Sequence, residues 1–274
     1  MRPLLETPWS PMRSRIPLLL AVAVFSTACI EPLETSNGRF GAITASAFDG
    51  GAANYTMRPE AAFYGETDLS YDPFTSDTCL LAQFFPNSTT INGSLRFLDA
   101  GDRLLTSVSG RIDTLVPVSN IGLRIYQSPN AGGIPYTPGD TLTITIPGAA
   151  YPASAISVRT AEPFTHSAVG VPAADEPLSL TWTPATVAGS QMTFSLRYAN
   201  SFSTTGLNEQ IFCSFVDDGA GTVPAALLGG WINALNAQRQ TKATRVRSRE
   251  VTVDARTRLS LLSTFSQPIN TTVQ

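Results

Sequence analysis

The stretch Asp140–Gly148, "DTLTITIPG", indicates the fold class most directly. Leu142, Ile144 and Ile146 alternate with threonines, and this period of two places apolar side chains on one face of a β-strand and hydroxyls on the other. The stretches "PLSLTWTP" (177–184) and "SQMTFSLRYA" (190–199) repeat the alternation. Turn-forming pairs such as Pro-Gly and Asp-Gly separate the runs at intervals of about 8–15 residues, which is typical of a sandwich or a barrel and not of an α/β fold.

One stretch has helical spacing instead. Pro224 suits the first turn of a helix, and "AALLGGWINALNAQ" (225–238) carries apolar residues at helical intervals, although its Gly-Gly pair weakens the pattern. Residues 244–255 and 257–266 then predict a terminal β-hairpin that turns near Asp254-Ala255. We therefore expect an all-β fold, an antiparallel β-sandwich with one short helix near the C-terminal third that caps one end.

The N-terminal region predicts where the protein is located in the cell. Ile16–Phe25 is apolar throughout, follows Arg13 and Arg15, and leads into "STAC" at Ser26–Cys29. A basic start, a short apolar run and small residues are the parts of a secretory signal, and the run is shorter than the roughly 20 residues of a membrane-spanning helix. The "STAC" stretch resembles the bacterial lipobox, in which the cysteine (here Cys29) is acylated and becomes the mature N-terminus. Ordinary signal-peptidase cleavage and an uncleaved anchor are the alternatives.

We expect four parts along the chain. Residues 1–28 are the signal peptide, 29–38 the lipidated N-terminus and tether, 39–267 a single large β-sandwich domain, and 268–274 a C-terminal tail. The tether "IEPLETSNG" is polar and turn-rich, as a flexible spacer should be. Each buried methylene of an acyl chain adds about 0.8 kcal/mol, so two or three chains hold a domain firmly on a membrane. The expected location is extracytoplasmic, on the outer membrane or the periplasmic face.

The charge and the cysteine content bear on two further points: nucleic-acid binding and disulfide formation. The net charge is −3 and charged residues make up 14% of the chain, which argues against a general nucleic-acid binder. The chain has three cysteines, so assigning Cys29 to lipid leaves Cys79 and Cys213. Both lie in apolar, strand-like runs, and an oxidising compartment predicts that they form a disulfide. Two buried free thiols are the alternative.

Four motifs together resemble a loose group of bacterial surface lipoproteins. They are "LDAGDRL" (98–104), "YTPGDTLTITIPG" (136–148), "LSLTWTP" (178–184) and "FCSFVDDGAGTVPAALL" (212–228). These motifs are structural, and no activity is established for the group. The resemblance therefore implies a β-sandwich and a surface or periplasmic location, and no catalytic residue.

The sequence offers little that could carry catalysis. His166 is the only histidine, it lies in a loop-like stretch, and no Gly-x-Ser-x-Gly elbow is present. One histidine cannot supply two metal ligands. Asp217 and Asp218 are weak candidates for calcium, because Asp-Asp-Gly also makes an ordinary turn before the expected helix. We expect no enzyme activity and no cofactor.

Three arginines and three tyrosines are the candidates for partner binding. Arg245, Arg247 and Arg249 share one face of an expected strand, where they could meet lipid headgroups, anionic polysaccharide or an acidic partner. Charges on an edge strand also serve to block aggregation. The three tyrosines are Tyr55, Tyr64 and Tyr71. Exposed aromatic rings can stack on sugars, although core packing explains such residues more often.

These observations predict a binding protein. We expect a membrane-anchored extracytoplasmic lipoprotein that acts as a structural or accessory subunit, with a place in a larger envelope complex. Its partners would be the membrane, through the lipid, and an envelope protein, with polysaccharide as a further candidate and no nucleic acid. The alternative function is a surface carbohydrate-binding module, and a hydrolase is the third choice.

Overall fold

The alternating stretches form strands in an all-β fold. The structure is a computed structural model that describes residues 38–65, 77–83, 96–120, 123–199, 207–269 and 271–272. The "DTLTITIPG" stretch contains β9 (Thr141–Ile146), with Leu142, Ile144 and Ile146 buried. Gly148 follows with a φ of +93°, which a glycine adopts without strain, and turns the chain toward β10 (Ser154–Arg159).

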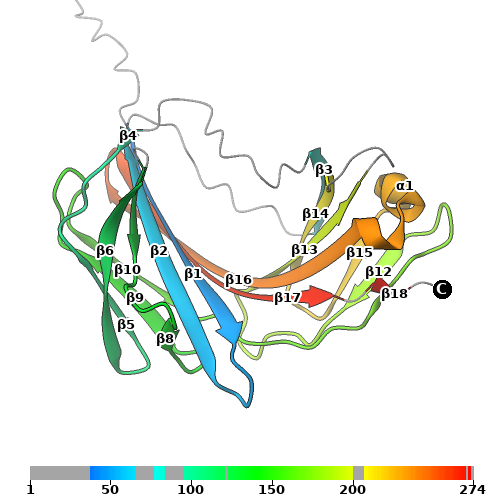
Figure 1. The fold of residues 1–274 in the computed structure, drawn as a ribbon, viewed down its shortest axis with the longest axis horizontal. Helices are drawn as coiled ribbons and strands as arrows, with labels where there is room; N and C mark the ends of the chain where they lie inside the picture. Colours follow the sequence, from blue (N-terminus) through cyan, green and yellow to red (C-terminus); the bar gives the residue numbers. More distant parts are fainter. Residues whose placement is uncertain are drawn as a thin grey trace, which may run out of the picture. The chain divides into compact units, whose positions relative to one another are not determined.

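Among the described residues, fourteen strands belong to one sheet, which is antiparallel except for one pair (Figure 1). Its order is β10-β9-β5-β6-β7-β2-β1-β17-β16-β13-β14-β3, and β4 and β8 also pair with β2. The strands not yet bounded are β1 (Arg39–Asp49), β2 (Tyr55–Gly65), β3 (Thr78–Gln83), β4 (Arg96–Phe97), β5 (Leu104–Val108), β6 (Arg111–Asn120), β7 (Leu123–Gln127), β8 (Ile134–Pro135), β13 (Gln191–Tyr198), β14 (Glu209–Val216), β16 (Arg239–Asp254) and β17 (Thr257–Ile269).

The remaining strands form two short sheets of two strands each. One pairs β11 (Val169–Gly170) with β18 (Thr271–Thr272), and the other pairs β12 (Leu178–Thr181) with β15 (Ala220–Val223). The β12 strand buries Leu178 and Leu180 and exposes Ser179 and Thr181, which alternate with them, as its sequence predicts.

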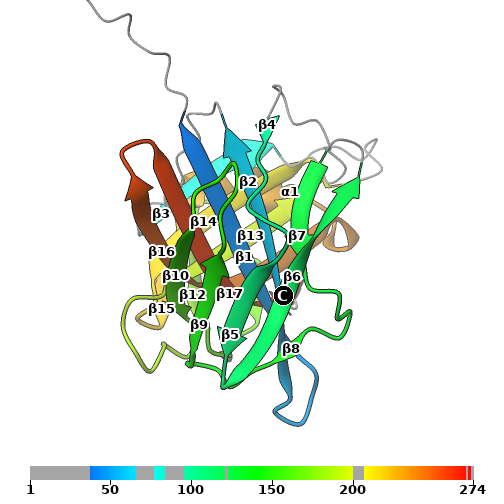
Figure 2. The same cartoon turned by 90° about the vertical axis from the view of Figure 1, so that its left-hand side faces the viewer.

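The sheet folds back on itself to make the sandwich. Strand β10 is one edge of the sheet, yet it contacts β16 and β17 near the middle of the strand order (Figure 2). The apolar faces of β5, β9 and β10 therefore meet those of β1, β2 and β17, and the core between them includes Ile43, Phe63, Leu104, Leu142, Ile144, Ile156, Leu259 and Leu261. The prediction of an all-β sandwich is confirmed.

The terminal hairpin links this layered region to the remaining strands. Strands β16 and β17 turn at Ala255-Arg256, as the sequence predicts. Residues 239–246 of β16 pair with β13, whereas residues 247–254 extend past the beginning of β13. Strand β17 pairs with β16 along nearly its whole length and also, in parallel, with β1. The hairpin is therefore shared by both parts of the sheet.

The expected helix is α1 (Ala225–Asn233), the single α-helix among the described residues, and a 3-10 turn, η1 (Asn236–Gln238), follows it. It buries Leu228 and Trp231 and packs against β13. A Cβ at Gly230 would lie 2.7 Å from the Tyr198 hydroxyl, so this glycine permits the close approach of helix and strand. The described residues include no helix with the length and apolar character needed to span a membrane.

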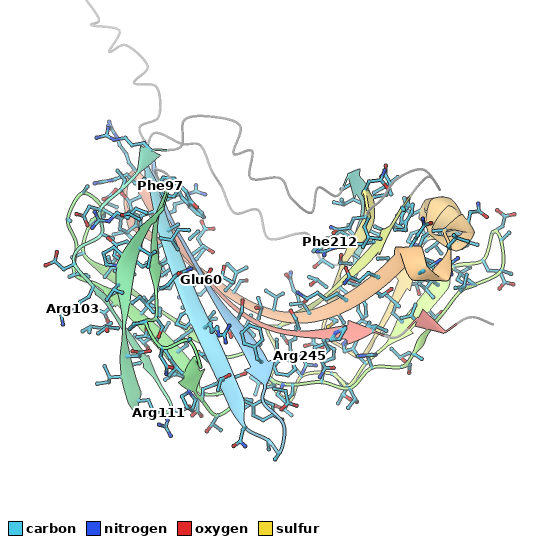
Figure 3. The ribbon with its side chains drawn as sticks, viewed as in Figure 1. Glu60, Phe97, Arg103, Arg111, Phe212 and Arg245 are labelled. Atoms are coloured by element: carbon cyan, nitrogen blue, oxygen red, sulfur yellow. A yellow bond between two sulfur atoms is a disulfide. The ribbon has the colours of Figure 1, made fainter. Side chains whose placement is uncertain are left out.

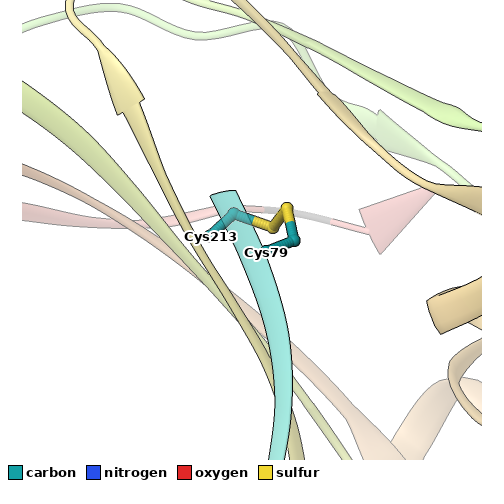
Figure 4. The surroundings of a disulfide bond; sticks show 2 residues. All are labelled: Cys79 and Cys213. Atoms are coloured by element: carbon teal, nitrogen blue, oxygen red, sulfur yellow. A yellow bond between two sulfur atoms is a disulfide. The ribbon is translucent and has the colours of Figure 1, made fainter. Parts of the chain in front are cut away.

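The predicted disulfide is confirmed. Cys79 of β3 and Cys213 of β14 are directly opposed in the two strands, and their sulfur atoms are bonded at 2.03 Å (Figure 4). Strand β3 is the other edge of the sheet, so the bond fastens this edge strand to its neighbour. The signal peptide and Cys29 lie outside the described residues, so the expected boundaries of the leader, tether and domain stay predictions.

Candidate functional site

A groove of about 460 Å³ lies between the edge strand β10 and the part of β16 that extends past β13. We call it the β10–β16 groove. Its lining residues are Ala155, Ile156, Ser157, Val158, Arg159, Gly189, Arg247, Ser248, Arg249 and Val251. Its volume is within the range of about 300–1,000 Å³ that is usual for ligand sites.

The backbone of β10 presents unpaired polar groups to this groove. The Thr160 N–H donates to the Asp140 carbonyl at 2.8 Å, which fixes the hydrogen-bonding phase of the β9–β10 ladder. In an antiparallel ladder, alternate residues face the partner strand. The backbone groups of Ala155, Ser157 and Arg159 therefore point away from β9, and no partner strand meets them within the part of the chain that the structure describes.

The edge of β16 that faces the groove also has backbone groups without a partner strand among the described residues. The Ala199 N–H donates to the Gln238 carbonyl at 3.2 Å, so the even-numbered residues of β16 direct their backbone groups toward β13. Strand β13 begins at Gln191, opposite Val246. Beyond that point the backbone groups of Ser248 face the groove, and Gly189, just before β13, lines the groove on the same side.

The charge of the groove is positive. Arg159 and Arg249 are exposed, and neither forms an ion pair with any described residue. No aspartate or glutamate is among the lining residues. Arg247, the third arginine of the lining, is buried and paired with Glu162 at 2.9 Å. The groove therefore offers two uncompensated cations beside two open strand edges, which suits an extended anionic ligand.

The expectation that Arg245 and Arg247 lie on an exposed face is wrong. The two side chains are 2% and 4% exposed, and Arg245 (labelled in Figure 3) pairs with Asp217 at 2.7 Å. The remaining donors of Arg245 bond to the carbonyls of Glu162, Pro163 and Thr183 and to the second Asp217 oxygen. All five guanidinium N–H groups thus have acceptors, and the side chain ties three loops to β16.

Asp217 has a structural role in the same place. Its carboxylate accepts hydrogen bonds from Trp182 Nε1 at 2.8 Å and from Ser190 Oγ at 2.6 Å, besides the two from Arg245. Asp218 accepts from the Ala220 N–H in a turn. The oxygens proposed as weak calcium ligands are therefore used within the protein. The described residues contain no group of three or more His, Cys, Asp or Glu side chains placed to hold a metal ion.

Tyr55 and Tyr64, the two predicted tyrosines that the structure describes, do not form an exposed platform. Tyr55 is partly buried, with its ring near those of Tyr136 and Phe265. Tyr64 packs on Phe97 with ring centres 5.1 Å apart, and burial raises the pKa of its hydroxyl. Tyr71 lies outside the described residues. Among those that are described, Phe48 is the one exposed aromatic side chain.

In the described part of the chain, the His166 ring has no hydrogen bond to the side chain of a serine, threonine or cysteine. The residue forms a single β-bridge with Trp182, and its Nδ1 lies 3.0 Å from the Ser167 carbonyl oxygen.

Asp99, in the "LDAGDRL" segment that leads into β5, stabilises the local loop through hydrogen bonds. Its carboxylate accepts from the Gly101 N–H, the Tyr126 hydroxyl and Arg124, and the pKa of Asp99 is lowered, mainly by the bond from Gly101.

A second hollow, of about 480 Å³, lies beside Asp99 and includes Asp102, Arg103 and Leu105. It mixes acidic and basic side chains and borders β5 and β9, which are both paired on their two sides. It therefore lacks the open backbone edges and the single sign of charge that distinguish the β10–β16 groove.

Comparison with protein-family models gave no match to this chain. Searches of curated proteins and of solved structures likewise gave no match. The geometry of the groove is therefore the main guide to function.

Sequence reasoning missed Arg159 and the groove itself. The alternation in "ASAISVR" (153–159) indicates that Arg159 projects from the polar face of a strand. It does not indicate that this strand is an edge, because edge position depends on which strands pair. Of the three predicted arginines, only Arg249 is exposed and lines the groove.

Proposed function

We propose that this protein is a lipid-anchored, extracytoplasmic accessory subunit of a bacterial envelope, belonging with the surface lipoproteins that its motifs resemble. In this role it holds an envelope protein in the β10–β16 groove. The observation that carries the proposal is the presence of two open strand edges beside two exposed arginines, Arg159 and Arg249, that form no ion pair with the described residues. Such a surface has the features expected of a contact site for an acidic, extended segment.

The N-terminal pattern and the disulfide support the proposed extracytoplasmic location. The apolar run Ile16–Phe25 and the following "STAC" motif match the parts of a secretory signal with an acylated cysteine. Disulfides persist in the periplasm and on cell surfaces, so the Cys79–Cys213 bond is consistent with export. A tether of about ten residues would let the sandwich reach a neighbouring protein from the membrane.

The arrangement of side chains favours binding over catalysis. General acid–base chemistry needs a titratable group within hydrogen-bond reach of a substrate. The groove is lined by arginines, serine and aliphatic residues, and His166 does not line it. The carboxylates of Asp217 and Glu162 are held by buried arginines, where they stabilise loops. The groove therefore has groups for recognition, and its lining includes no carboxylate or imidazole for proton transfer.

Co-purification from native membranes tests the proposal. Protein extracted in mild detergent should retain a bound envelope protein, and the double variant Arg159→Glu/Arg249→Glu should lose it. Arg111→Glu is the matched control, because Arg111 (labelled in Figure 3) is an exposed arginine at the β5–β6 turn and is not among the residues that line the groove. Equal recovery of the bound protein with the double variant and the control would refute the role of the groove.

A further inference from the structure

We infer that the β10–β16 groove binds an acidic polypeptide segment in extended form, as an additional β-strand along the outer edge of β10. This inference rests on the proposed function and names the kind of partner and the mode of its binding. An added strand forms main-chain hydrogen bonds with an exposed sheet edge, while pockets for alternate side chains supply specificity.

The backbone of β10 has the regular pattern that strand addition requires. Ala155, Ser157 and Arg159 each direct one N–H and one C=O away from β9. Successive residues of a strand are about 3.3 Å apart, so these pairs of groups repeat every 6–7 Å or so, the repeat of an incoming strand. Over the six residues of β10 the edge is about 20 Å long, which accommodates a segment of about six residues.

The exposed side chains on the open edge of β10 are either small or positively charged. The side chains of Ala155 and Ser157 are small, so they do not hinder an approaching backbone, and both are exposed. Arg159 and Arg249 stand on opposite walls of the groove, with no acidic lining residue between them. An incoming segment with carboxylates on both faces would meet one arginine on each wall. Binding should therefore weaken as salt screens the charges.

The first measurement uses a defined probe. The full mature protein in mild detergent is titrated into a fluorescein-labelled octapeptide, Glu-Glu-Val-Val-Glu-Glu-Val-Val, whose carboxylates lie on both faces of an extended strand, and anisotropy is recorded at low and at physiological salt. The Arg159→Glu/Arg249→Glu variant should bind at least about tenfold more weakly than wild type, and Arg111→Glu should bind as wild type does. Absence of saturable binding by wild type would overturn the inference.

A second pair of variants tests the strand geometry. Ser157→Pro removes an N–H that points into the groove and is not used by β9, so the native sheet should tolerate it. It should weaken peptide binding about fivefold to tenfold, as expected for one lost hydrogen bond and a local clash. Ser157→Ala keeps the N–H and should bind normally. Equal binding by the two variants, with unchanged thermal unfolding, would overturn strand addition.

Hydrogen exchange gives a readout independent of affinity. On peptide binding, the amides of Ala155, Ser157 and Arg159 should become protected, whereas those of Ile156 and Val158 already bond to β9 and should change little. The competitors are polygalacturonate and a glutamate peptide interrupted by Pro-Pro pairs, in which N–H groups are lost from both edges of the strand, so neither should add a strand. Displacement by either at equal charge would contradict the polypeptide assignment and favour a general anion site.

The two proposals can fail separately. If the native envelope protein is lost from the Arg159→Glu/Arg249→Glu variant but the peptide experiments fail, the groove is a contact site that binds in another way. If the native protein is retained by that variant, the proposed function itself is wrong.

Discussion

Replacing Arg245 with methionine tests the role of the Arg245–Asp217 pair, the most deeply buried ion pair among the described residues. Methionine has similar length and no charge, so the change removes the guanidinium and leaves the volume nearly filled. The Asp217 side chain is only 2% exposed and would keep two of its donors, Trp182 Nε1 and Ser190 Oγ. A buried charge that loses its partner costs about 3–5 kcal/mol, which is a large part of the roughly 5–15 kcal/mol that stabilises a typical domain.

The expected effect is readily measured. For a domain of this size each kcal/mol shifts the melting temperature by about 2–4 °C, so Arg245→Met should lower it by roughly 6–20 °C. Urea unfolding should be followed by tryptophan fluorescence, because Trp182 bonds directly to Asp217 and reports on this region. Arg111→Met is the control: it alters an exposed arginine and should change stability by no more than about 0.5 kcal/mol.

A double variant separates charge from packing. If the cost comes from the unpaired carboxylate, Arg245→Met combined with Asp217→Asn should be more stable than the sum of the single effects predicts, by about 1–3 kcal/mol. Strict additivity would show that the two side chains do not act as a pair. A loss below about 1 kcal/mol for Arg245→Met alone would refute the reasoning that Arg245 fastens three loops to β16.

Four further changes have defined outcomes. Serine at both Cys79 and Cys213 should lower the free energy of unfolding by up to about 5 kcal/mol, because the bond closes a loop with a sequence separation of 134; a reductant-insensitive wild type would contradict this. Cys29→Ala should move the protein from the membrane fraction to the soluble fraction, and an unmodified mature N-terminus in the wild type would exclude acylation. His166→Ala should leave both thermal unfolding and partner retention unchanged, and lost retention in a folded variant would indicate chemistry at this residue. The lowered pKa of Asp99 stabilises the fold above the carboxyl's unfolded pKa of about 4, and this stabilisation is lost as pH falls through the folded pKa; Asp99→Asn should therefore flatten the acid limb of a stability–pH curve, and an unchanged limb would contradict it.

Local patterns were sufficient to predict much of the fold. The alternation around Ile144 predicted β9, helical spacing after Pro224 predicted α1, and the last turn lies where the sequence places it. The pairing of Cys79 with Cys213 followed from assigning Cys29 elsewhere, and the structure confirms the bond. These features depend on residues close in sequence, or on a choice with few alternatives.

The site could not be predicted in the same way. An Arg-x-Arg-x-Arg run with polar neighbours looks exposed, but the partners that bury Arg245 and Arg247 are 28 and 85 residues away. The strand continues past the loops that cover its first arginines, so the same face is interior at Arg245 and exposed at Arg249. The groove depends on β10 being the last strand of the sheet, which is a property of the whole topology.

The shared hairpin has a consequence for the time at which the chain can fold. Strand β1, at the beginning of the domain, pairs in parallel with β17, near the end, and β16 completes both the layered region and the β13–β14 part of the sheet. Pairings between such distant segments form late, because the long loop must close first. A chain that emerges N-terminus first therefore lacks the central strands of both parts until its final residues are available. On the export route proposed above, such a topology would keep the polypeptide unfolded during its passage through a translocation channel, and the sandwich would form only after the crossing.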